Sequence, residues 1–154
     1  MTDLDPYSEE ILSTLEARGR LTNIELARRV GLSPSACLRR VQDLERAGVI
    51  QGYRAIIDRA ALSPRITVFV TVGLAQQLHK DALAFERAMD AAPQVLECHN
   101  IAGNVEYLLR VEVADLAEYK DFHAHTLGEL PQIHSITSHF CLDTSKDLRN
   151  RLVR

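Results

Sequence analysis

Arginine side chains are concentrated in residues 18–54 of this 154-residue chain. That segment holds eight arginines, no lysine and three acidic residues, whereas the whole chain has a formal net charge of −3. The planar guanidinium fork binds guanine edges and phosphates through paired hydrogen bonds, a geometry that the lysine ammonium lacks. A positive cluster made of arginine alone therefore predicts contact with nucleic acid.

The same segment has the spacing of two short helices joined by a turn. Thr22 and Glu25 are placed to form a capping box for a first helix, whose apolar residues recur at positions 24, 27 and 30. Gly31 favours the left-handed backbone that ends a helix. Ser33 and Pro34 then suit the N-cap and first turn of a second helix. These signals predict a helix-turn-helix over residues 22–48.

The second helix is predicted to turn Leu38, Val41 and Leu44 inward, which leaves its polar and arginine-bearing face free to enter a major groove of double-stranded DNA. A plain helical hairpin with a solvated charged face is the alternative, and the arginine cluster disfavours it. The predicted DNA-binding residues are Ser33, Ser35, Ala36, Arg39 and Arg40, with Arg28 and Arg54 on either side.

Composition and charge pattern limit the classes of protein to which the chain can belong. A chain with 46% hydrophobic and 25% charged residues is typical of a globular protein. The amino terminus is acidic where a signal peptide needs a basic start, and the longest nearly uncharged apolar run, 66–75, is about half of a membrane span. The three cysteines lack C-x-x-C spacing, as expected of reduced thiols. We expect a cytoplasmic protein without membrane association, metal or cofactor.

Pattern breaks divide the chain into two domains. Asp5 and Pro6 suit the start of a helix that precedes the hairpin, and the β-branched stretch 49–58 predicts a short strand that serves as a wing or connector. The break at residues 62–64 is followed by a more acidic composition. We predict a helix-turn-helix domain over 1–62 and a second domain over 63–154.

The second half alternates strand and helix periodicity in an informative order. Strands are predicted over 66–74, 95–102, 105–113 and about 133–142, with helices over 78–92 and from 115 to Pro131. Gly103 and Asn104 suit a tight turn between the middle strands. The order β-α-β-β-α-β is the ferredoxin-like plan, so the fold class is α+β with an N-terminal winged helix-turn-helix.

That plan leaves one sheet face without helices, and we expect a homodimer to cover it. Ser135, Thr137, His139 and Cys141 alternate along the last strand and could line either an effector pocket or this interface. Cys98 and His99 on the second strand suggest zinc together with His139 and Cys141. However, the second and fourth strands lie on opposite edges of such a sheet, roughly 14 Å apart, so an intrachain metal site would not close and only a site across an interface remains as an alternative.

The chain resembles the leucine-responsive regulatory protein/AsnC family of feast-or-famine transcription regulators over nearly its whole length. The matching residues are Asn23-Ile24-Glu25-Leu26-Ala27, Val30-Gly31-Leu32-Ser33-Pro34, Cys37-Leu38, Arg40-Val41, Leu44-Glu45, Gly48-Val49-Ile50-Gln51-Gly52-Tyr53, Gly103-Asn104-Val105-Glu106-Tyr107-Leu108-Leu109 and Leu130-Pro131. The resemblance implies operator binding by the first domain, and oligomerisation and amino-acid sensing by the second. It also implies homodimers that assemble into octamers or open helices.

The resemblance further implies that the loop before the third strand holds the charged ends of an effector at the contact between dimers. The implied effector residues are Ala102, Gly103, Asn104, Val105 and Glu106, to which we add Ser135, Thr137 and His139. This loop departs from the family's commonest pattern, Gly-Asp-x-Asp-Tyr, because Asn104 and Glu106 replace its aspartates. The identity of the effector therefore does not carry over from leucine-responsive relatives, and a solvated strand-edge residue is the alternative for Glu106.

The sequence leaves two alternatives to a regulator. One is a small dimeric ferredoxin-like enzyme with His99 or His139 as general base, but the sequence shows no group at a spacing that would orient such a base. The other is a ligand-binding assembly module whose helix-turn-helix only packs against a partner. The arginine-rich helix favours a DNA-binding regulator, modulated by a small effector, over both.

Overall fold

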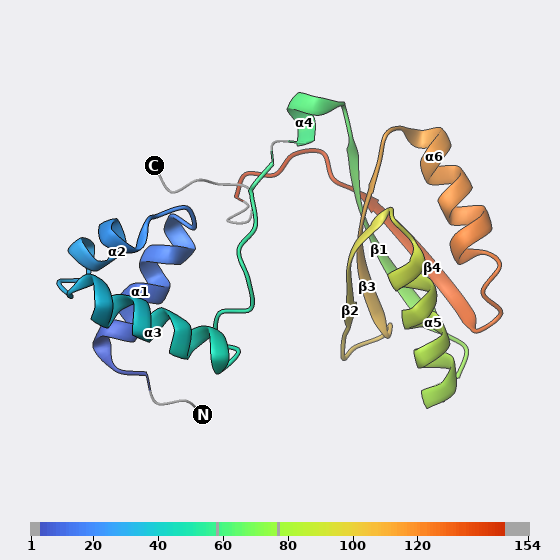
Figure 1. Cartoon of the computed structure of the whole chain (residues 1–154). Helices are drawn as coiled ribbons and strands as arrows, with labels where there is room; N and C mark the ends of the chain where they lie inside the picture. Colours follow the sequence, from blue (N-terminus) through green and yellow to red (C-terminus); the bar gives the residue numbers. More distant parts are fainter. Residues whose placement is uncertain (1–3, 58, 77, 147–154) are drawn as a thin grey trace. The chain divides into compact units, whose positions relative to one another are not determined.

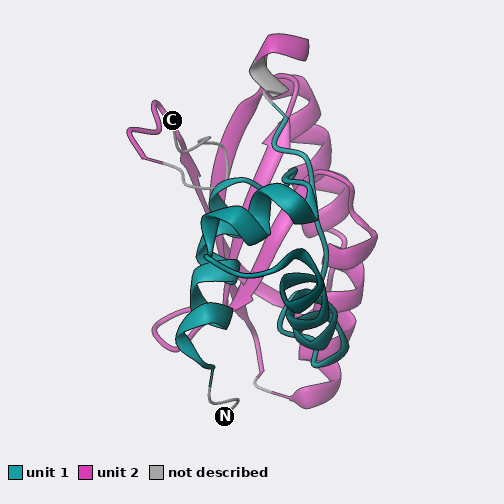
Figure 2. Ribbon diagram, turned by 60° about the vertical axis from the view of Figure 1, so that its left-hand side comes forward, with its two compact units in different colours: residues 1–57, 147–154 teal, residues 58–146 magenta. Residues whose placement is uncertain are grey.

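The computed structural model describes residues 4–57, 59–76 and 78–146, and it divides into two compact units (Figures 1 and 2). Among the described residues, unit 1 contains 4–57 and unit 2 contains 59–146. Each unit has its own hydrophobic core. The two are therefore described separately.

Unit 1 contains the helices α1 (Pro6–Ala17), α2 (Asn23–Arg29) and α3 (Pro34–Arg46). The Asp5 side chain accepts a hydrogen bond from the Ser8 amide at 2.9 Å and caps α1, with Pro6 in the first turn. Gly31 follows α2 with a φ of 69°, a conformation that a residue with a Cβ rarely adopts. The predicted helix-turn-helix and its preceding helix are confirmed.

Two apolar residues of this hairpin face solvent, contrary to the predicted inward pattern. Ile24 is 70% exposed and Leu38 is 46% exposed. On α3 the buried stripe begins one residue earlier, at Cys37, and reaches Leu44 seven residues later, two full turns of helix. The buried core of unit 1 consists of Ile11, Leu26, Ala27, Val30, Cys37 and Leu44.

The strand predicted over 49–58 does not form in residues 49–57, and residue 58 lies outside the described part of the chain. A strand needs a hydrogen-bonded neighbour, and none of the described strands pairs with this segment. Residues 51–57 are exposed and lack regular secondary structure, and the Tyr53 hydroxyl donates a hydrogen bond to Glu45 at 3.0 Å. This segment is therefore a connector that does not pair with any described strand.

Unit 2 begins with the short helix α4 (Arg59–Leu62) and contains a four-stranded antiparallel sheet in the order β2-β3-β1-β4. The remaining elements are β1 (Ile66–Leu74), α5 (His79–Ala91), β2 (Val95–Asn100), β3 (Tyr107–Val113), α6 (Leu116–Asp121), the π-helical turn η1 (Phe122–Leu127) and β4 (Ile133–Phe140). This is the predicted ferredoxin-like order, and β2 and β4 are the two edges.

Alternation along the strands gives the sheet one buried and one open face. Val68, Val70 and Val72 of β1 are fully buried against α5, α6 and η1. The intervening Thr67, Phe69 and Thr71 lie on the other face and are only partly buried. No described helix of unit 2 packs its apolar side on that open face.

The last helical segment differs from the regular helix predicted up to Pro131. It widens into η1, where the Gly128 amide donates to the His123 carbonyl at 2.9 Å, five residues back. The wider turn buries both Phe122 and Leu127. Leu116, the first residue of α6, is 62% exposed.

The turn between β2 and β3 is wider than the two-residue turn predicted at Gly103 and Asn104. The Ile101 amide donates to the Glu106 carbonyl at 2.8 Å, which closes a loop with four residues between them. Gly103 has no positive φ, which a type I′ turn would require.

Candidate DNA-binding surface and effector site

Local hydrogen bonds fix both helices of the hairpin at their amino-terminal ends. Thr22 and Glu25 form the predicted capping box, with bonds of 2.9 and 3.2 Å. The Thr22 hydroxyl, at 2.7 Å, and then the Thr22 amide donate hydrogen bonds to the Glu25 carboxylate, and these two bonds hold the pKa of that carboxyl below its ordinary value. The Ser33 hydroxyl accepts from the Ala36 amide at 3.3 Å and so caps α3. These caps set where each helix begins.

A side-chain bond also joins the starts of the two helices. Asn23, the first residue of α2, donates through Nδ2 to the carbonyl of Pro34, the first residue of α3, at 2.8 Å. This bond bridges eleven residues of sequence and helps to set the spacing between the helices. Sequence analysis did not single out Asn23 for this contact.

Most of the predicted DNA-binding residues are exposed in unit 1. On α3, Ser35, Ala36 and Arg39 lie within one helical turn of one another and face solvent. The others that are exposed are Ser33 at the N-cap, Arg28 in the last turn of α2 and Arg54 in the connector. The amino-terminal half of α3 thus presents a small, polar and cationic surface of the kind that fits a major groove.

Arg40 is placed differently from Arg39. Its guanidinium Nη1 lies 2.5 Å from Asp5 Oδ2 and 3.4 Å from Ser8 Oγ. Its Cζ lies 5.4 Å from the centre of the Tyr7 ring. All three partners belong to α1 or its cap, so Arg40 connects the two helices.

Glu106 and Ser135, two of the predicted effector residues, meet beside Gly73 in unit 2. A Cβ added at Gly73 would lie 2.5 Å from Ser135 Oγ and 3.7 Å from Glu106 Oε2. Glu106 Oε2 accepts a hydrogen bond from the Leu74 amide at 2.7 Å. The pairing of β1 with β4 shifts register at this point, between Gly73 and Leu74. Because Gly73 has no side chain, it leaves room for both the carboxylate and the hydroxyl.

The other predicted effector residues lie around this point. The loop residues Ala102, Gly103 and Asn104 are exposed, and Val105 is partly buried. Thr137 pairs with Thr71 and His139 with Phe69, farther along the same open face. Successive same-face residues of a strand are about 7 Å apart. The structure therefore groups Ser135 with Glu106 and leaves His139 two such steps away.

Known proteins match both units. Residues 67–150 match the Lrp/AsnC ligand binding domain, and residues 4–51 match a winged helix-turn-helix DNA-binding domain. The chain is 37% identical to the leucine-responsive regulatory protein of Escherichia coli over 151 residues, which cover 98% of this chain and 92% of that protein. The chain belongs to the Lrp/AsnC family. It is therefore a DNA-binding transcription regulator that responds to a small effector.

Solved structures of transcription regulators agree with this assignment. A transcriptional regulator from Neisseria meningitidis in complex with L-Met matches with a TM-score of 0.88 at 33% identity, covering 94% of this chain and 93% of that one. An AsnC family transcriptional regulator from Agrobacterium tumefaciens also has a TM-score of 0.88, at 32% identity and 94% coverage of both chains.

The open face of this Lrp/AsnC chain carries an ionic group that sequence analysis missed. Arg110 Nη1 lies 3.3 Å from Glu97, and its Nη2 lies 2.9 Å from Glu112. His99 Nε2 lies 3.3 Å from the same Glu97. The alternation of Arg110 and Glu112 along β3 was a sequence signal that both share one face, but the pairing with β2 needed the register.

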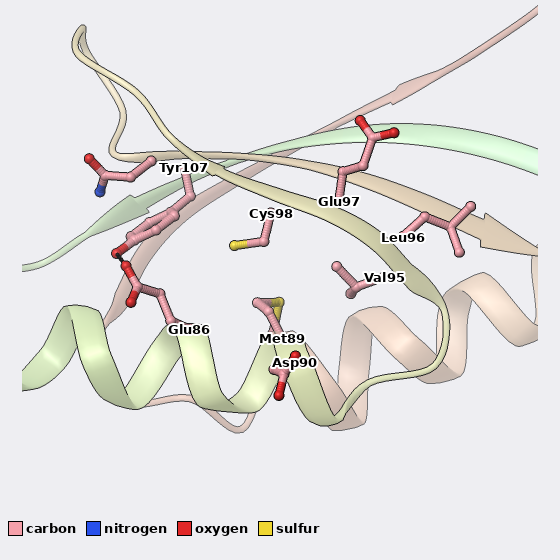
Figure 3. A pocket seen from close by; sticks show the side chains of 9 residues that line it. Glu86, Met89, Asp90, Val95, Leu96, Glu97, Cys98 and Tyr107 are labelled. Carbon is pink, nitrogen blue, oxygen red and sulfur yellow. Dashed lines mark hydrogen bonds between the residues drawn. The ribbon is translucent and has the colours of Figure 1, made fainter. Parts of the chain in front are cut away.

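A cavity of about 460 Å³ opens elsewhere in unit 2, between α5 and β2 (Figure 3). Its lining residues are Glu86, Met89, Asp90, Val95, Leu96, Glu97, Cys98, Asn100 and Tyr107. Burial, and then the Glu86 charge, raise the pKa of the Cys98 thiol to about 11, so the thiol stays protonated near neutral pH. None of the predicted effector residues lines this cavity.

In the part of the chain that the structure describes, two further features concern metal binding and membrane spanning. No cluster of three or more His, Cys, Asp or Glu side chains there is arranged to hold a metal ion. Within the same residues, no helix combines the length and apolar character needed to cross a bilayer.

Proposed function

We propose that this regulator senses an amino acid or close analogue beside Gly73. The observation that carries the proposal is that the Glu106 carboxylate and the Ser135 hydroxyl both lie beside that glycine. An amino-acid zwitterion needs an acceptor for its ammonium group and donors for its carboxylate. Glu106 supplies the acceptor, while the Ser135 hydroxyl and the amides of loop residues 102–105 supply donors.

Two relatives support an amino acid as the effector class. The Neisseria meningitidis regulator was crystallised in complex with L-Met, and the Escherichia coli relative is named for its response to leucine. In this chain, Asn104 and Glu106 stand where the family most often has aspartates, so the loop carries one negative charge fewer. We infer that the preferred amino acid differs from that of family members with the common loop.

DNA binding in this proposal rests on the exposed amino-terminal half of α3. Ser35, Ala36 and Arg39 read base edges in the major groove, while Ser33, Arg28 and Arg54 contact phosphates. In sequence terms we assign residues 1–62, with the connector and α4, to the DNA-binding domain and 63–154 to the effector domain, although α4 itself groups with unit 2. The protein works as a cytoplasmic regulator and not as an enzyme.

The regulator acts as a homodimer that assembles to an octamer or a higher oligomer. The open face of the sheet supports this, because Phe69 and Leu108 are only partly buried there and no described helix of the unit covers them. Paired DNA-binding domains would then read two half-sites related by the symmetry of the dimer.

The proposal is tested by DNA binding in the presence of candidate effectors. A labelled duplex from upstream of the chain's own gene is titrated with the full-length protein at fixed salt, alone and with each of the twenty amino acids. We expect operator binding that at least one amino acid shifts severalfold. Operator binding that none of them changes would contradict the amino-acid effector, and no preference over a scrambled duplex would contradict sequence-specific readout.

A further inference from the structure

Arg40 is the arginine of α3 that another helix engages. Asp5 Oδ2 and Ser8 Oγ lie 2.5 and 3.4 Å from the same Nη1 atom, and the Tyr7 ring lies against the guanidinium. Hydrogen bonds between ionised groups are stronger than neutral ones, and an aromatic face adds a cation–π contact. The Arg40 side chain is 32% exposed, so these contacts are partly shielded from water.

The neighbouring arginine provides a contrast within the same helix. Arg39 is exposed, next to Ser35 and Ala36, whereas Arg40 reaches 35 residues back along the sequence to the cap of α1. The contact pins the middle of α3 to the beginning of α1. Rotation of α3 about its own axis would break it, and such a rotation would also turn Arg39 away from its present direction.

We propose that Arg40 is a positioning residue: through Asp5 it sets how α3 presents Arg39 and Ser35 to the major groove. The inference rests on the proposed mode of DNA binding and refines it, since Arg40 then contributes to operator recognition through Asp5 rather than by contacting a base or phosphate. Asn23 and Pro34 fix the start of α3 in the same way, and Arg40 fixes its middle.

The two roles for Arg40 predict opposite effects of neutralising Asp5. If Arg40 leaves Asp5 to contact DNA, Asp5→Asn removes a competitor and a negative charge that repels phosphate, so binding tightens or stays the same. If Arg40 positions α3, the same substitution weakens operator binding. Asparagine also serves as an N-cap, so Asp5→Asn keeps the start of α1.

The experiment is a double-mutant cycle in operator affinity, measured by fluorescence anisotropy on the full-length protein with Asp5→Asn, Arg40→Met and the double variant. We expect each single variant to weaken operator binding about threefold to tenfold, and the double variant to be no weaker than either single one. Affinity for a scrambled duplex should change less than twofold, because a wrongly oriented α3 loses its contacts with base edges but keeps the charge contacts with phosphates.

Circular dichroism and thermal unfolding of each variant report folding, and Arg40→Lys provides a milder change. Lysine keeps the charge but not the planar fork, so a positioning role predicts partial loss, whereas a simple phosphate contact predicts near wild-type affinity. Unchanged or tighter binding by Asp5→Asn in a folded protein would overturn the proposal, as would an equal loss on both duplexes in Arg40→Met. Wild-type protein that binds neither duplex would instead overturn the proposed function.

Discussion

Glu106 Oε2 accepts a hydrogen bond from the Leu74 amide at 2.7 Å, across 32 residues of sequence. The Glu106 amide also donates to the Val72 carbonyl at 3.1 Å. The carboxylate is thereby held against the end of β1, beside Gly73. A fixed carboxylate loses little side-chain entropy when it binds a ligand ammonium group.

Two substitutions distinguish the role of the Glu106 charge from that of its hydrogen bond with the Leu74 amide. Glu106→Gln keeps a side-chain carbonyl for the Leu74 amide but removes the charge, so effector affinity should fall tenfold or more while folding is retained. Glu106→Ala also loses the bond and should lower the free energy of unfolding by about 1–3 kcal/mol. Calorimetry against the twenty amino acids, with thermal unfolding of both variants, measures the two effects. Equal effector affinity in wild type and Glu106→Gln would make Glu106 a structural residue only.

Gly73→Ala tests the close approach of Ser135. The new Cβ would lie 2.5 Å from Ser135 Oγ, which must move, whereas Ser135 Cβ at 3.8 Å is at an ordinary contact distance. We expect a loss of about 1–3 kcal/mol in the free energy of unfolding. The double variant Gly73→Ala/Ser135→Ala should recover most of it, because the clashing atom is gone. Denaturant unfolding of Gly73→Ala, Ser135→Ala and the double variant checks this, and additive losses would show that the clash lies elsewhere.

Local signals explain what the sequence predicted well. The caps at Asp5, Thr22 and Ser33 each depend on a residue three positions away, so a single chain reveals them. Strand alternation likewise predicted β1 and β3, with their buried valines. The ferredoxin-like order followed from the sequence of these elements.

Contacts between distant residues explain what the sequence did not predict. The sequence places Arg40 among the groove-facing residues of α3. Its contact with Asp5 could not be predicted, because the two residues are 35 positions apart. In the sequence, Gly73 is an ordinary position of an alternating strand. Only the register of β4 shows that Ser135 lies against it. The π-helical turn at Phe122–Leu127 was also missed, because its residues have unremarkable helical spacing.

Binding to operator DNA should depend steeply on salt. A dimer with about three phosphate contacts per domain should give a slope near −5 in a plot of log affinity against log salt concentration, from roughly 0.9 per contact. Anisotropy titrations between about 50 and 200 mM salt measure it. A slope near zero, or full affinity from a monomeric 1–62 fragment, would contradict a paired, arginine-based interface.

Arg39→Ala should weaken operator binding by about 1–3 kcal/mol per half-site and relax specificity at one base position. Arg46→Ala is the matched control, because Arg46 lies in the last turn of the same helix and pairs with Asp43. We expect the control to stay close to wild type. Binding of each protein to an operator and to duplexes with single-base changes measures both effects. Equal losses in Arg39→Ala and Arg46→Ala would show that Arg39 acts through its positive charge and not by contacting a base.

Cys98 should react slowly at neutral pH although part of the residue is exposed, because the partial burial of its thiol beside α5 and then the Glu86 charge raise its pKa to about 11. Alkylation requires the thiolate, so the rate at Cys98 should rise about tenfold per pH unit from pH 7 to 10. In unfolded protein the pKa returns towards about 8.5, and the site should react much faster at pH 8. Glu86→Gln should raise the rate in folded protein, because it removes the carboxylate charge that disfavours the thiolate. Peptide-resolved mass spectrometry after timed iodoacetamide treatment measures each rate, and equal rates for folded and unfolded protein at pH 8 would show that the site on β2 does not protect this thiol.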